Sequence, residues 1–235
     1  IILSFYSFER LAMLLGYSLW AMPNVSIDTA LPHLSGLGYD AVEIVVLPNF
    51  SNALTKMDAA ERRRIPGLLT QNGLTLSAVN YYTALMEPDA AVFAGHLAAI
   101  KETIDLAVQW TQGDQPPVVI SGVGGKPGEL PARLPELLDR AGAIGEYAAS
   151  RGVVIALEPH IGAAIETPDL MASVIEQVAS PAIRVNFDIS HFNVMGIPIE
   201  ESVVTMLPYT AHTHIKDERG RAPNYEYVVP GEGEF

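Results

Sequence analysis

The sequence contains no cysteine, which excludes disulfide bonds, thiolate metal ligands and a thiol nucleophile. Basic residues are also scarce, because 14 Lys and Arg stand against 27 Asp and Glu and give a net charge of −13. Broad contact with a phosphate backbone depends on clustered Lys and Arg, so we expect no nucleic-acid partner. No apolar run approaches the roughly 20 residues that span a bilayer, and the apolar first eight residues lack the positive start of a signal peptide. We therefore expect a soluble, cytoplasmic protein with no membrane partner.

The chain has 235 residues, of which 49% are hydrophobic and 17% are charged. This length suits one domain with a substantial core, and the composition is typical of a folded protein. No linker or low-complexity stretch divides the chain, so we expect a single domain over residues 1–235. The chain begins with Ile1 rather than Met and ends at residues 230–235 in a predicted loop. On this basis we expect an incomplete copy of a longer protein.

Short apolar runs alternate with longer amphipathic stretches, which is the pattern of repeated βα units around a parallel sheet. The predicted strands cover residues 14–19, 41–46, 74–79, 118–121, 153–157, 183–187 and 211–215. The predicted helices cover residues 28–37, 61–69, 90–110 and 134–149, and a fifth begins at Thr167-Pro168. Glycine separates helix from strand at Gly38, Gly73 and Gly152, as expected of a helix end.

Seven such strands fit either a doubly wound open sheet or an eight-stranded barrel that lacks its last strand. The first strand is not followed by Gly-x-Gly-x-x-Gly, so the dinucleotide-binding sheet loses its main support. The glycine-rich run Gly122 to Lys126 lacks the spacing of a phosphate-binding loop, and we interpret it as a flexible turn. The predicted fold is a TIM-type (β/α) barrel of the α/β class, without strand eight.

The chemistry of such a barrel collects at the carboxyl ends of its strands. Glu158 ends the fifth predicted strand, Asp188 follows the sixth, and His214 lies near the end of the seventh. Buried carboxylates need a cation, because an unpaired buried charge is costly. Two carboxylates and one imidazole form an oxygen-rich donor set, which suits Mn²⁺, Mg²⁺ or Co²⁺, with Zn²⁺ as an alternative. We predict that Glu158, Asp188 and His214 bind a divalent metal, and we expect Mn²⁺.

Other polar residues near the strand ends are candidates for substrate binding. His212 lies two residues before His214, so both side chains point to one face of the strand, and His214 is nearer the predicted mouth. Glu43 lies within the second strand, Trp20 follows the first, and Arg219 follows the seventh. Trp20 suits a pocket wall or the core equally well. Arg219 suits an anchor for a hydroxyl or phosphate, or a solvated loop charge.

In this order the motifs resemble those of the xylose isomerase-like TIM barrel superfamily, which contains sugar phosphate isomerases and epimerases. They are Gly38-Tyr39-Asp40-Ala41-Val42-Glu43, Ala156-Leu157-Glu158-Pro159-His160, Asn186-Phe187-Asp188-Ile189-Ser190-His191, His212-Thr213-His214-Ile215-Lys216-Asp217 and Pro230-Gly231-Glu232-Gly233. The resemblance implies metal binding by Glu158, Asp188 and His214, and substrate contact by His191. It also implies a fourth metal ligand, a Glu at the end of strand eight, and the sequence stops before that strand.

The working hypothesis is a metal-dependent isomerase or epimerase of a ketose, keto-acid or sugar phosphate that acts through an enediolate. Glu158 is the candidate base, and His191, Glu43, Arg219 and Trp20 are candidate substrate contacts. An inosose-type dehydratase or isomerase shares these ligands. A hydrolase similar to endonucleases of abasic DNA sites needs more metal ligands and a basic surface. A non-catalytic sugar-binding module stays open because strand eight is absent, and so does self-association into a homo-oligomer.

Overall fold

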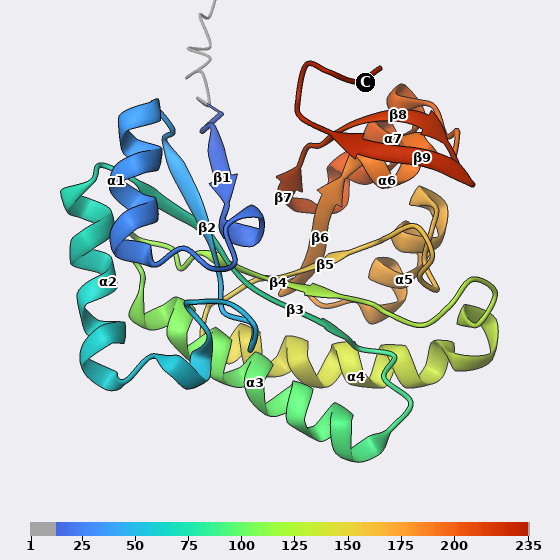
Figure 1. The fold of residues 1–235 in the computed structure, drawn as a ribbon. Helices are drawn as coiled ribbons and strands as arrows, with labels where there is room; N and C mark the ends of the chain where they lie inside the picture. The colour runs from blue at the N-terminus through green and yellow to red at the C-terminus, as the bar shows by residue number, and fades with distance from the viewer. Residues whose placement is uncertain (1–12, 235) are drawn as a thin grey trace, which may run out of the picture.

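Residues 13–234 are described by a computed structural model, in which seven parallel strands form one curled sheet (Figure 1). The strands lie side by side in chain order, and each neighbouring pair is parallel. They are β1 (Gly16–Ser18), β2 (Ala41–Val45), β3 (Thr75–Ala84), β4 (Val118–Gly122), β5 (Ile155–Glu158), β6 (Ile183–Asp188) and β7 (Thr210–His214). All seven predicted strands are confirmed within this part of the chain, with shifted ends.

Helices connect the strands and cover the outer face of the curled sheet (Figure 1). They are α1 (Ile27–Leu37), α2 (Ala59–Gln71), α3 (Ala90–Gln109), α4 (Leu130–Ser150), α5 (Pro168–Val178), α6 (Ile189–Val194) and α7 (Ile199–Met206), with short 3-10 turns at Leu19–Ala21, Leu54–Lys56 and Leu207–Tyr209. Seven parallel strands in sequential order, connected by helices, form an incomplete TIM barrel. The predicted fold class is therefore confirmed for residues 13–234, and the first twelve residues of the predicted domain lie outside the described part.

Local signals in the sequence set the ends of these helices. Thr167 caps α5 by accepting a hydrogen bond from the backbone N–H of Leu170, and Pro168 occupies the first turn, as predicted. Asp89 caps α3 by accepting from the N–H groups of Ala91 and Val92. Gly38 ends α1 in the left-handed region with φ of 89°, which a residue with a side chain rarely adopts.

The core lies mainly between the sheet and its helices. Large side chains such as Leu31, Ile65 and Trp110 are fully buried there. A much smaller apolar cluster fills the inside of the curled sheet, where Ile120 packs with two alanines. Several polar side chains of the strands are also buried, among them Glu43, Glu158, Asn186 and Asp188. Among residues 13–234, no helix has both the length and the apolar character that crossing a bilayer requires.

The segment after β7 differs from the sequence interpretation, which treated it as a loop. It forms an antiparallel hairpin of β8 (Asp217–Arg221) and β9 (Asn224–Val228), in which β8 packs on α6 near the carboxyl end of β6 (Figure 1). The backbone N–H of Ala222 bonds to the carbonyl of Val194 at the end of α6. The charged run from Asp217 to Arg221 lacks the alternation of apolar and polar residues that predicts a strand. The short helices α6 and α7 are also absent from the sequence prediction.

Candidate metal centre

Three carboxyl ends of neighbouring strands bring Glu158, Asp188 and His214 together. Glu158 ends β5, Asp188 ends β6, and His214 ends β7, where it lies opposite Asp188 in the sheet register. Their ligand atoms all lie within 4.8 Å of one another. Glu158 is 5% exposed and Asp188 is fully buried. The three residues predicted as metal ligands therefore form one cluster at the mouth of the barrel, with both carboxylates buried and His214 partly buried.

The two carboxylates of this cluster are balanced by cationic or polarisable side chains. Lys216 Nζ lies 2.6 Å from Asp188 Oδ2, and His191 Nε2 lies 3.3 Å from Glu158 Oε1. Burial alone would raise the pKa of Glu158, but hydrogen bonds from His191 and His214 and the charge of Lys216 hold that pKa well below its usual range. Glu158 is thus an ionised carboxylate at neutral pH, as a metal ligand must be.

His214 lies between two buried carboxylates from opposite parts of the sheet. Its Nε2 donates to Glu43 Oε2 at 2.6 Å, and its Nδ1 lies 3.6 Å from Glu158 Oε2. Burial alone would lower the pKa of His214, but Glu43 and Glu158 more than offset that effect and raise the pKa to about 10. In turn, His214 keeps the pKa of Glu43 lowered although burial opposes this. Glu43, predicted as a substrate contact, is therefore a direct partner of a predicted metal ligand.

Asn186 is a residue of this centre that the sequence interpretation missed. Its fully buried amide donates through Nδ2 to Glu158 Oε2 at 2.8 Å and lies 3.0 Å from His214 Nδ1. Its Oδ1 lies 3.0 Å from His212 Nδ1. Its spacing could have identified it, because Asn186 lies two positions before Asp188 on the same strand and its side chain therefore points to the same face as that of Asp188.

His191 is brought to the centre but is fully buried there. Tyr227 of the hairpin places its hydroxyl 2.8 Å from His191 Nδ1, and Lys216 Nζ lies 3.0 Å from His191 Nε2. The ring of His160 lies against the ring of His191, with centroids 3.8 Å apart. His191 thus links the carboxylates to Lys216, Tyr227 and His160, whose parts in the centre the sequence analysis did not predict.

A cavity of about 230 Å³ opens beside His160. Its lining includes Tyr82 of β3, the backbone at Gly124 and Gly125, and the loop after β5. At Gly125, with φ of 72°, an added Cβ would lie 2.9 Å from the Cβ of Ala164, so a side chain has no room there. The glycine run interpreted as a flexible turn therefore forms part of this wall.

Two predicted substrate contacts lie further from the ligands. Trp20 is half-exposed in the turn after β1, and its ring centroid lies 6.0 Å from that of Tyr82, which lines the cavity. Arg219 lies in the hairpin, where it pairs with Glu226 at 3.6 Å and donates to the carbonyl of Glu232. Trp20 is thus next to a cavity residue, whereas Arg219 is not brought into the metal centre.

The donor set at the strand ends fits a divalent metal ion. Two carboxylates and an imidazole converge there, and both carboxylates are buried. The ammonium of Lys216, within ion-pair distance of Asp188, is further evidence that this position attracts positive charge. Glu158, Asp188 and His214 are therefore the candidate ligands for a divalent ion in this part of the chain.

The comparison with known families agrees with this architecture. The profile of the xylose isomerase-like TIM barrel family matches residues 31–235, which is most of the chain. The protein therefore belongs to this family, and the resemblance found in its strand-end motifs is confirmed. No curated protein matches the sequence significantly.

Solved structures with the same fold include proteins with bound metals or sugars. A xylose isomerase-like TIM barrel protein from Mycobacterium smegmatis, in complex with magnesium, is 20% identical, with a TM-score of 0.73 over 94% of this chain and 82% of that chain. D-psicose 3-epimerase from Clostridium cellulolyticum H10, with D-tagatose, is 18% identical, with a TM-score of 0.73 over 90% and 78%. The IOLI protein with a bound zinc atom is 17% identical, with a TM-score of 0.75 over 94% and 80%. At these identities the likeness establishes the common fold.

Proposed function

We propose that this protein is a divalent-metal-dependent isomerase or epimerase of a small sugar or sugar-derived ketone. The observation that carries the proposal is the buried cluster of Glu158, Asp188 and His214 at the mouth of the barrel. Active sites of TIM barrels lie at this end of the strands. A solved relative of the same fold is a sugar epimerase with a bound ketose, and others hold magnesium or zinc, which supports the same reading.

In the proposed site, Glu158, Asp188 and His214 hold the ion, and we propose Mn²⁺ because two of the three donors are carboxylates. A bound divalent ion supplies Lewis-acid polarisation of a substrate carbonyl, which makes the hydrogen on the neighbouring carbon more acidic. The protein's own residues must then bind the substrate, orient it and move that proton.

We assign proton abstraction to the carboxylate of Glu158. This group is ionised, and it is 5% exposed at the end of β5. Its lowered pKa makes it a weak base, so it accepts a proton only from a carbon that the adjacent carbonyl has already made acidic. Burial favours the reaction because it excludes bulk water from the carbon and the carboxylate.

We assign substrate contact to residues on both sides of this carboxylate. His191, which lies 3.3 Å from Glu158, is placed to bond a substrate oxygen beside the reacting carbon. The cavity next to His160 has room for the remaining part of a small sugar, and Trp20 adds an aromatic wall through its contact with Tyr82. Glu43 acts indirectly by holding His214. Arg219 has no role in this proposal, because its partners are hairpin residues.

The test is exchange of the hydrogen next to the carbonyl in D₂O, followed by NMR on a panel of ketoses with the Mn²⁺-loaded full chain. We expect exchange on at least one ketose, and we expect Glu158→Gln to slow it at least about 100-fold, which is the usual scale of a lost general base. Glu146→Gln, at an exposed position on α4, serves as the matched control and keeps the rate.

The result that contradicts the proposal is the absence of exchange on every ketose while Mn²⁺ is bound. That outcome favours a non-catalytic sugar-binding module if the ketoses still bind. Formation of a dehydrated product instead of an exchanged one assigns the centre to a dehydratase. A Glu158→Gln variant that exchanges at the normal rate retains the function but removes Glu158 as the base.

A further inference from the structure

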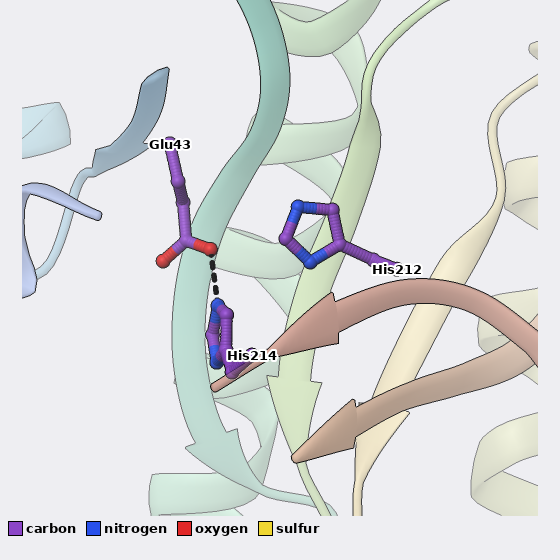
Figure 2. Close-up of side chains that lie close together, drawn as sticks. All are labelled: Glu43, His212 and His214. Carbon is purple, nitrogen blue, oxygen red and sulfur yellow. Dashed lines mark hydrogen bonds and ion pairs between the residues drawn. The ribbon is translucent and has the colours of Figure 1, made fainter. Parts of the chain in front are cut away.

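A second group of ligand-type side chains lies deeper in the barrel than the strand-end cluster. Glu43 from the middle of β2 and His212 and His214 from β7 have ligand atoms within 4.8 Å of one another. Figure 2 shows the three side chains pointing toward one another from these two strands. Glu43 and His214 are separated by 171 positions in the sequence, so only the folded barrel creates this group.

Glu43 presents a single oxygen to the centre of this group. Its other oxygen, Oε1, accepts hydrogen bonds from Ser18 Oγ at 2.7 Å and from Asn80 Nδ2 at 2.8 Å. Its Oε2 faces His214 at 2.6 Å. Glu43 is only 2% exposed, so these neighbours fix the orientation of the carboxylate. Outer partners that orient a carboxylate in this way are typical of metal ligands.

His212 keeps a free lone pair for the same centre. The amide of Asn186 has a fixed orientation, because its Nδ2 donates to Glu158 at 2.8 Å and a carboxylate can only accept. The oxygen of that amide therefore faces His212 Nδ1, at 3.0 Å, and the proton of the His212 ring lies on Nδ1. Nε2 of His212 is left as an acceptor, which is the form of histidine that binds a metal.

His214 is shared between this group and the strand-end cluster. Its Nε2 faces Glu43, whereas its Nδ1 faces Glu158 at 3.6 Å. A metal bound at Nε2 requires the ring proton on Nδ1, where it is directed at Glu158, as in the carboxylate–histidine–metal arrangement of many metal sites. The amide Nδ2 of Asn186, which lies 3.0 Å from this Nδ1, then donates to Glu158 alone. A neutral imidazole binds one ion, so the two groups cannot both use His214 at the same time.

We propose that Glu43, His212 and His214 form a second metal site that is selective for zinc and excludes an ion from the strand-end cluster. Two imidazoles and one carboxylate are a donor set that Zn²⁺ takes in catalytic sites, with a fourth position left open. The strand-end cluster has two carboxylates and one imidazole, which suits Mn²⁺ or Mg²⁺ better. Because both sites need His214, zinc bound with Glu43 and His212 displaces manganese from Glu158 and Asp188.

The test is calorimetric titration of the metal-free full chain with Zn²⁺ alone and with Mn²⁺ alone. We expect His212→Gln and the isosteric Glu43→Gln each to weaken Zn²⁺ binding at least about tenfold. Of the two, His212→Gln is the selectivity test and should change Mn²⁺ binding less than about twofold, whereas Glu43→Gln also removes the partner that orients His214. Asp188→Asn gives the reverse pattern. His33→Gln, an exposed histidine on α1, is the control for zinc binding by surface imidazoles. Circular dichroism shows whether each variant folds. If either His212→Gln or Glu43→Gln fails to fold, the other variant, on a different strand, still tests the zinc site.

Two outcomes overturn the proposal. One is Zn²⁺ binding that depends on Asp188 and not on His212 or Glu43, which places zinc at the strand-end cluster. The other is simultaneous binding of one Zn²⁺ and one Mn²⁺ per chain, which contradicts competition for His214. These results are independent of the proposed reaction, because both readouts use the metal alone. The visible spectrum of the Co²⁺-substituted chain gives a further check, since the intense bands of four-coordinate cobalt are expected to weaken in His212→Gln and not in Asp188→Asn.

Discussion

At the scale of single residues, a buried amide such as that of Asn186 must find partners for its N–H groups and its oxygen, or it destabilises the fold. Its partners here are Glu158, His214 and His212, at 2.8 to 3.0 Å. One side chain on β6 therefore links ligand-type residues from β5 and β7. Because these bonds restrict the rotation of the Glu158 and His214 side chains, Asn186 preorganises the proposed metal ligands.

We predict that Asn186→Ala weakens Mn²⁺ binding by about 10- to 100-fold, as is usual when an outer partner of metal ligands is removed. The physical reason is that Glu158 and His214 lose the donor that orients them. Equilibrium Mn²⁺ titration measures the effect, with Asn72→Ala at the end of α2 as the control. An unchanged Mn²⁺ affinity in a folded Asn186→Ala variant would show that the amide does not position the ligands.

The metal affinity should also depend on pH through His214. Glu43 and Glu158 raise the pKa of His214 to about 10, so below that pH the imidazole carries a proton that an incoming ion must displace. Affinity therefore increases with pH, by about tenfold per unit for one displaced proton, and levels off above about pH 10. Calorimetry in buffers of different ionisation enthalpy counts the released proton. Mn²⁺ affinity that is constant from pH 6 to 8 would contradict this account.

At the scale of elements, the helices hold the strand ends in place from outside the barrel. Helix α3 packs on β3, the strand that carries Tyr82, and it begins at Asp89. The Asp89 side chain accepts hydrogen bonds from the N–H groups of Ala91 and Val92 at 2.8 and 3.0 Å. These N–H groups have no partner within the helix, so the cap contributes to the stability of the whole element.

We expect Asp89→Ala to lower the free energy of unfolding by about 1 kcal/mol, the usual cost of a lost N-cap. Urea unfolding followed by circular dichroism measures this value. Asp114→Ala removes the same charge in an exposed loop and should change the free energy of unfolding by less than about 0.5 kcal/mol. Equal losses in the two variants would assign the effect to net charge rather than to capping.

At the scale of the whole molecule, the proposed metal centre can form only in the folded barrel, because its candidate ligands come from separate strands. An ion that binds the folded chain and not the unfolded chain must stabilise the fold. At a free concentration 100 times the dissociation constant, Mn²⁺ should add about 2.7 kcal/mol. Thermal unfolding with and without a chelator tests this, and the Glu158→Gln variant should gain little. A melting temperature that does not respond to Mn²⁺ would contradict the prediction.

Much of this organisation could be predicted from the sequence. Fully apolar runs such as residues 153–157 identified buried strands, and the alternation with helices predicted the barrel. Carboxylates and His214 directly at strand ends predicted the cluster, since parallel strands bring those ends together. The contact of Glu43 with His214 could not be predicted, because it depends on how the sheet curls. The first strand of the hairpin that places Tyr227 on His191, Asp217–Arg221, has no alternating pattern, so the pairing becomes visible only in three dimensions.

The most direct test of the central claim is the number of Mn²⁺ ions that the chain binds at the strand-end cluster. Titration of the metal-free chain, followed by the electron paramagnetic resonance signal of free Mn²⁺, gives both stoichiometry and affinity. We predict about one ion per chain for the unmodified protein, and affinity reduced at least about tenfold in Asp188→Asn. Asp169→Asn, in the first turn of α5, should bind as the unmodified chain does. Equal binding by the unmodified chain and by Asp188→Asn would contradict the assignment of this cluster as the metal centre.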